Sequence, residues 1–99
     1  MSKKRYVMAV DLGASNGRCI LGEWDGNQLG GREILRFHNG PITTADGRVW
    51  WNIQSIYTYI LEALRKCKAE GCIPECIGID SWGQDFGLLD ESGLPLSMV

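Results

Sequence analysis

Residues 6–18 read YVMAVDLGASNGR, a short apolar run that ends in a carboxylate and a series of small residues. The run Tyr6–Val10 has no charged position, which predicts a strand buried on both faces of a sheet. The stretch from Asp11 to Gly17 predicts a tight turn, because glycine and small residues tolerate sharp changes of direction. Residues 18–24 then predict a second strand, so a strand, a turn and a returning strand open the fold.

The following residues extend this pair into a meander. Asp25-Gly26-Asn27 is a strong hairpin signal, because glycine and asparagine tolerate positive φ. Residues 28–37 predict a third strand, in which Gly30-Gly31 indicates a weak point or a bulge. Residues 38–48 are polar and turn-rich, which predicts a loop containing His38.

The middle of the chain shows helical periodicity. Apolar residues spaced by three and four positions predict the buried face of an amphipathic helix: Ile53, Ile56, Tyr57, Ile60, Leu61 and Leu64. Asn52 is a favourable N-cap and Gly71 a favourable C-terminal stop. Trp50 and Trp51 precede the helix, and we interpret them as a hydrophobic staple and a core anchor.

A fourth strand is predicted after the helix. Residues 76–80 are apolar up to Asp80, residues 81–85 predict a loop, and residues 86–89 predict one more strand. A helix between strands places the fourth strand parallel to the first. The β-β-β-α-β order with a mixed sheet predicts an α/β fold of the ribonuclease-H-like or actin-like ATPase type, which does not by itself define a function.

Composition narrows the function. The chain has 99 residues, 44% of them hydrophobic, and a net charge of −2, which is typical of one small globular domain. An acidic chain without a large basic cluster argues against nucleic-acid binding. No apolar stretch approaches the length of a membrane span or of a signal-peptide core, so we expect a cytoplasmic protein without a membrane partner.

Asp11 and the residues after it form the first candidate site. A carboxylate at the end of a buried strand is costly without a partner or a task. The loop lets backbone N–H groups approach an anion, and Ser15 and Asn16 add side-chain donors. Asp11 could then hold a hydrated Mg²⁺ beside phosphates. An ordinary hairpin turn explains the same residues equally well, so both interpretations stay open.

The second candidate site is Asp80-Ser81-Trp82-Gly83-Gln84-Asp85-Phe86. Carboxylates and amides bind sugar hydroxyls, and an indole can cover an apolar sugar face. The alternative is a polar turn with Trp82 packed in the core. Both candidate sites follow neighbouring parallel strands, at the sheet edge where ligands of such folds bind.

Three segments together resemble one protein family. Residues 9–18, AVDLGASNGR, resemble the first phosphate loop of the FGGY carbohydrate kinases of the rhamnulokinase branch. Residues 32–40, REILRFHNG, resemble the third strand and following loop of that branch, and residues 77–90, IGIDSWGQDFGLLD, resemble its sugar-site segment. The likeness runs nearly end to end and identifies residues 1–99 as an N-terminal part of the first kinase domain, without the second domain.

This resemblance implies an activity and a set of site residues. The family transfers the γ-phosphoryl group of ATP to a ketose, L-rhamnulose in this branch. Asp11 would help to hold Mg²⁺ through water, and the loop and the start of the next strand would meet the ATP phosphates through Gly13, Ala14, Ser15, Asn16, Gly17 and Arg18. Trp82, Gly83 and Asp85 would contact the sugar.

The resemblance also implies what these 99 residues lack. The general base, the second phosphate loop and the adenosine pocket of the family come later in the chain, so no catalytic residue is assigned here. We expect the 99-residue chain alone to be inactive and to need the remainder of its kinase chain as a partner. Unpaired strand edges predict non-native self-association of the isolated piece.

Three other interpretations of these residues compete with the kinase. An actin-like nucleotide-binding module would need the Asp11 loop but not the sugar-site segment. A two-metal nuclease would need Asp11, Glu62 and Asp80 to converge. Cys67, Cys72 and Cys76 invite a zinc site, but a fourth ligand at short spacing is missing, so we expect reduced, mostly buried thiols.

Overall fold

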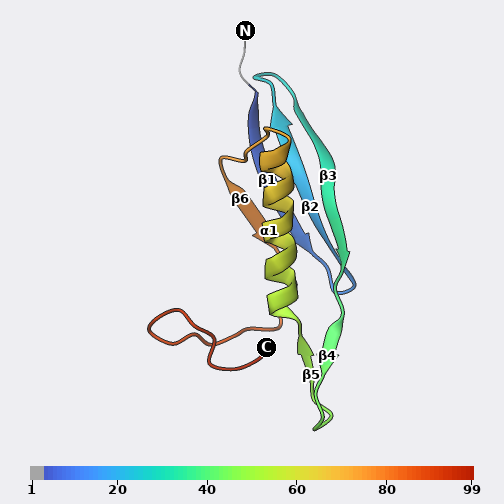
Figure 1. Ribbon diagram of the computed structural model, residues 1–99, viewed down its shortest axis with the longest axis vertical. Coiled ribbons are helices and arrows are strands. Elements are labelled where there is room, and N and C mark those ends of the chain that lie inside the picture. Colours follow the sequence, from blue (N-terminus) through green and yellow to red (C-terminus); the bar gives the residue numbers. More distant parts are fainter. Residues whose placement is uncertain (1–3) are drawn as a thin grey trace.

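The computed structural model describes residues 4–99, and its centre is a mixed four-stranded sheet with the strand order β3-β2-β1-β6 (Figure 1). One helix, α1, lies along one face of this sheet (Figure 1). The elements in chain order are β1 (Arg5–Leu12), β2 (Asn16–Trp24), β3 (Leu29–His38), β4 (Pro41–Thr43), β5 (Val49–Trp51), α1 (Ile53–Ala69) and β6 (Ile77–Asp80).

The predicted strand order is confirmed. β1, β2 and β3 form an antiparallel meander, and α1 is the crossover that returns the chain to pair β6 parallel to β1. The register of this parallel pair runs from Met8 beside Ile77 to Asp11 beside Asp80. The hairpin between β2 and β3 turns at Gly26, whose φ of 96° suits glycine.

The core lies between the sheet and α1. Alternate residues of β1 point into it, so Met8 and Val10 are buried whereas Ala9 is exposed. The prediction of a strand buried on both faces is therefore wrong for the described residues, because α1 covers one face only. The core side chains are Met8, Val10, Cys19, Leu21, Ile34, Phe37, Ile56, Ala63 and Cys67.

The helix is rotated relative to the face expected from its sequence. Asn52 caps it by accepting a hydrogen bond from the Ser55 N–H at 3.1 Å, as predicted. Tyr57, however, is 61% exposed, which contradicts its predicted burial. The small side chains of Ala63 and Cys67 are fully buried instead, because they let the helix approach the sheet closely.

No helix among residues 4–99 is long and apolar enough to cross a membrane.

Four further predictions are corrected by the structure. The loop expected at residues 38–48 contains β4, which pairs with β5 in a small two-stranded sheet. The register shift of β3 occurs at Ile34 and not at Gly30-Gly31, which pair in register with β2. Residues 86–89 form no strand, and only a single bridge joins Leu89 to Pro95. The cysteines were predicted to be mostly buried, but only Cys19 and Cys67 are, whereas Cys72 is half-buried and Cys76 is exposed.

Replacement of Gly17 tests the packing of β2 on the core. Gly17 is buried opposite Phe37, and a Cβ atom at this position would overlap the Phe37 ring. Gly17→Ala should therefore destabilise the fold by about 1–3 kcal/mol through overpacking. Chemical denaturation would measure this, with Gly30→Ala as the matched control because its Cβ would meet no atom within 4 Å. Equal stability of both variants would contradict the packing described.

Candidate functional site

The two candidate segments meet at one edge of the sheet. Asp11 and Asp80 are neighbours in the parallel register of β1 and β6. The turn of Gly13, Ala14 and Ser15 follows the first of these aspartates, and the segment from Ser81 follows the second. The sequence-based expectation that both segments leave the same end of adjacent parallel strands is confirmed.

The first turn is tighter than expected. Only residues 13–15 lie outside the strands, because Asn16, Gly17 and Arg18 already belong to β2. The Gly13 N–H donates to the Asn16 carbonyl at 2.9 Å and closes the turn. Within residues 4–99, no group accepts a hydrogen bond from the backbone N–H of Ala14 or Ser15, and both residues are exposed.

Gly17 has a packing role in this structure. It is buried, and the ring of Phe37 occupies the place where a side chain would be. Phe37 in turn stacks on Tyr59 of α1, with ring centroids 4.5 Å apart and planes inclined by 10°. Gly17 therefore allows the sheet to pack against the helix through Phe37, and it does so two residues after the turn of residues 13–15.

Arg18 already has an anionic partner. Its guanidinium forms an ion pair with the Asp11 carboxylate, and its Nη1 lies 4.0 Å from Oε1 of Glu33. The hydrogen bond from Arg18 is the main cause that lowers the pKa of Asp11, followed by the hydrogen bond with Asp80. Asp11 therefore stays ionised to a lower pH than an unpaired aspartate does.

Asp80 behaves in the opposite way. The hydrogen bond with Asp11 raises the pKa of Asp80, and desolvation adds to this effect. Two adjacent carboxylates repel each other when both are charged, so one of the pair retains its proton more readily. The interaction between the two side chains thus lowers the pKa of Asp11 and raises the pKa of Asp80.

Trp51 organises the second segment. Its indole lies on Trp82 with ring centroids 4.2 Å apart, and its Nε1–H donates to Oδ2 of Asp85 at 2.8 Å. Our interpretation of Trp51 as a core anchor is wrong, since it contacts two of the three residues expected to bind sugar. The pair Trp50-Trp51 before the helix stands out in the sequence, but no sequence pattern predicts that Trp51 contacts a segment more than thirty residues later.

Gly83 lies between these two contacts without a packing constraint of its own. A Cβ atom at Gly83 would meet no atom within 4 Å, and the backbone φ is not positive. A cavity of about 430 Å³ lies next to Trp51, between β5, the start of α1 and residues 95–99. Another, of about 290 Å³, lies beside Asn39 and Asn52.

The nuclease interpretation is not supported by the geometry. Glu62 is exposed on α1, and the described residues contain no group of three or more His, Cys, Asp or Glu side chains arranged to hold a metal ion. A cation at Asp11 would therefore need further ligands such as water and phosphate oxygens, which is the usual arrangement for Mg²⁺.

Comparison with known proteins identifies the relatives of the chain. No family model matches it. A rhamnulokinase of Halalkalibacterium halodurans is 41% identical over 92 residues, which are 93% of this chain and 19% of that protein. A rhamnulokinase of Yersinia pestis is 45% identical over 89 residues, which are 88% of this chain and 18% of that protein.

The chain is homologous to the rhamnulokinases. The resemblance inferred from the three sequence segments is thereby confirmed. The mixed sheet in β-β-β-α-β order agrees with the actin-like ATPase domain of the FGGY kinases to which rhamnulokinases belong. The chain spans about a fifth of the length of these relatives.

Replacement of Asp80 tests the coupling of the two carboxyl groups. Asp80→Asn removes one negative charge beside Asp11 and should raise the melting temperature at pH 7, measured by circular dichroism in the presence of EDTA. Glu91→Gln is the control, because it removes the same charge from an exposed turn. A melting temperature of the Asp80 variant at or below that of this control would show that the pair does not repel.

Proposed function

We propose that this chain forms the edge of an ATP-dependent sugar kinase at which the phosphates of ATP and a ketose such as L-rhamnulose meet. The observation that carries the proposal is the side-by-side placement of Asp11 and Asp80 at the ends of β1 and β6. It directs the turn of residues 13–15 and the segment of residues 81–85 toward one region. Homology to rhamnulokinases supports the choice of substrate.

The phosphate side of this edge has suitable donors. The exposed N–H groups of Ala14 and Ser15 lack an acceptor within the described residues and can bind phosphate oxygens. Asp11 would hold Mg²⁺ through water, and Mg²⁺ would neutralise the charge of the transferring phosphoryl group. When ATP binds, the Arg18 guanidinium would turn one of its N–H groups from the Asp11 carboxylate to a phosphate oxygen.

The sugar side combines an aromatic surface with a carboxylate. Trp82 is half-buried against the core and Trp51, so it would offer the sugar only the part of its indole that remains exposed. Asp85 would accept hydrogen bonds from sugar hydroxyls, while its Oδ2 is held by the Trp51 indole N–H. Gly83 leaves open space between them. An apolar ring face next to a hydrogen-bond acceptor is the usual combination in carbohydrate recognition.

Neither aspartate of the second segment is proposed as the general base. Asp80 lies beside Asp11 in the paired strands β1 and β6, and Asp85 is already held by the Trp51 indole. Phosphoryl transfer depends chiefly on positioning and charge neutralisation, which the residues of this edge can supply. Because no general base is assigned among these residues, we predict that the 99-residue chain alone forms no ADP.

The test is sugar-dependent ADP release by the complete protein with ATP and Mg²⁺. L-rhamnulose should give the highest kcat/KM in a comparison with L-fuculose, D-xylulose and glycerol. A different preferred ketose would keep the kinase and change its substrate. ATP binding without turnover on any sugar would favour an actin-like nucleotide-binding module instead.

Gly83 allows the sugar side to be tested separately from stability. Gly83→Val adds a side chain where the described chain leaves open space, so the fold should tolerate it. We expect the KM for the ketose to rise by roughly tenfold or more, because the branched side chain would occupy space proposed for the sugar. The KM for ATP should stay within twofold of wild type. An unchanged KM for the ketose would remove Gly83 from the site.

A further inference from the structure

One polar side chain is buried beneath the proposed phosphate turn. Asn39 directly follows β3 and is 3% exposed, and it is the buried polar residue of the described chain. An amide in such a position must satisfy its hydrogen-bonding groups, because an unpaired buried donor costs free energy. The partners of Asn39 therefore show what it does.

Asn39 binds the turn on both sides of Ala14. Its backbone N–H donates to the Ser15 carbonyl at 2.9 Å, and its side-chain Nδ2 donates to the Gly13 carbonyl at 2.9 Å. Asn39 is 26 residues away from Gly13 in sequence, so these bonds tie the end of β3 to the turn after β1. Two bonds from one buried residue fix the turn more firmly than either bond alone.

The planarity of the peptide bond extends this effect to the N–H groups of the turn. The Gly13 carbonyl and the Ala14 N–H belong to the same trans peptide unit, in which they point in opposite directions. Because Asn39 holds the Gly13 carbonyl toward the interior, the Ala14 N–H must point away from Asn39. The Ala14 N–H is one of the two turn donors, together with that of Ser15, that find no acceptor within residues 4–99.

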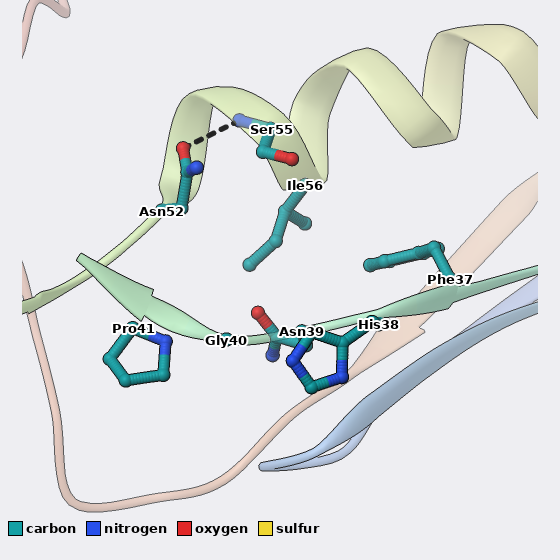
Figure 2. A pocket seen from close by; sticks show the side chains of 8 residues that line it. All are labelled: Phe37, His38, Asn39, Gly40, Pro41, Asn52, Ser55 and Ile56. Atoms are coloured by element: carbon teal, nitrogen blue, oxygen red, sulfur yellow. Dashed lines mark hydrogen bonds between the residues drawn. The ribbon is translucent and has the colours of Figure 1, made fainter.

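On its other side, the Asn39 side chain faces a cavity beside the start of α1. Figure 2 shows its amide oxygen directed toward Ile56 on α1 and its amide nitrogen directed away from the helix. A cavity of about 290 Å³ on the helix side is lined by Phe37, His38, Asn39, Gly40, Pro41, Asn52, Ser55 and Ile56. The side chain therefore spans the layer between the start of α1 and the turn of residues 13–15.

We propose that Asn39 is a positioning residue for nucleotide binding: it orients the Gly13–Ala14 peptide so that the Ala14 N–H faces a phosphate oxygen of ATP. This inference rests on the proposed function of the turn. A purely structural role would lower stability alone, whereas a positioning role changes the affinity for ATP more than the affinity for sugar.

The test compares Asn39→Asp with wild type in the complete protein. Aspartate keeps the shape but places an oxygen against the Gly13 carbonyl, which it repels. Titration calorimetry with Mg-ATP should show affinity weakened by about tenfold, as expected for loss of a buried hydrogen bond. The KM for the preferred ketose should remain within twofold of wild type.

Cys67→Ala is the matched control. Cys67 is fully buried at the far end of α1, so its truncation lowers stability without contact with the turn. If Asn39→Asp fails to fold, Asn39→Ala keeps the backbone bond to Ser15 and removes only the Nδ2 donor, and it should also weaken Mg-ATP binding.

The outcomes separate this inference from the proposed function. Wild-type affinity for Mg-ATP in the folded Asn39 variants, or a loss no larger than in Cys67→Ala, would overturn the positioning role. Equal losses for ATP and ketose would also overturn it, because they indicate general disruption. Wild-type protein that binds Mg-ATP but phosphorylates no ketose would overturn the kinase proposal, while the comparison of ATP affinities would still decide the role of Asn39.

Discussion

The parallel pairing of β6 with β1 is the constraint on which the site depends. An antiparallel meander alone would leave the Asp11 turn at the sheet edge without a partner segment. The crossover through α1 returns the chain in the same direction as β1, so that Asp80 ends beside Asp11. Two carboxyl groups and the turns that follow them are thereby brought together from positions far apart in sequence.

A column of packed groups connects the helix to the turn of residues 13–15, the proposed phosphate site. Tyr59 on α1 stacks on Phe37, whose ring fills the space above Gly17 at the start of β2. Asn39, two residues after Phe37 and directly after the end of β3, donates hydrogen bonds to the Gly13 and Ser15 carbonyls of the turn. The turn therefore does not depend on its own local geometry alone, and such preorganisation is what the proposed phosphate site would need.

Backbone order could be predicted from the sequence because it depends on local signals, such as the apolar runs, the Asn52 cap and glycine turns. The rotation of α1 could not, since its sequence contains two adjacent apolar stripes and the small Ala63 and Cys67 give a weaker signal than Tyr57. The contacts of Trp51 and Asn39 were also missed. Hydrogen bonds between segments distant in sequence leave no periodic pattern to read.

The most direct measurement of the central claim is hydrogen–deuterium exchange of the complete protein, analysed by mass spectrometry with each ligand in turn. A non-hydrolysable ATP analogue with Mg²⁺ should slow exchange in peptides covering residues 13–16, and L-rhamnulose should slow exchange in peptides covering residues 81–86. Ligand binding that leaves both of these segments unchanged while protecting other parts of the protein would contradict the claim that nucleotide and sugar meet at this edge of the sheet.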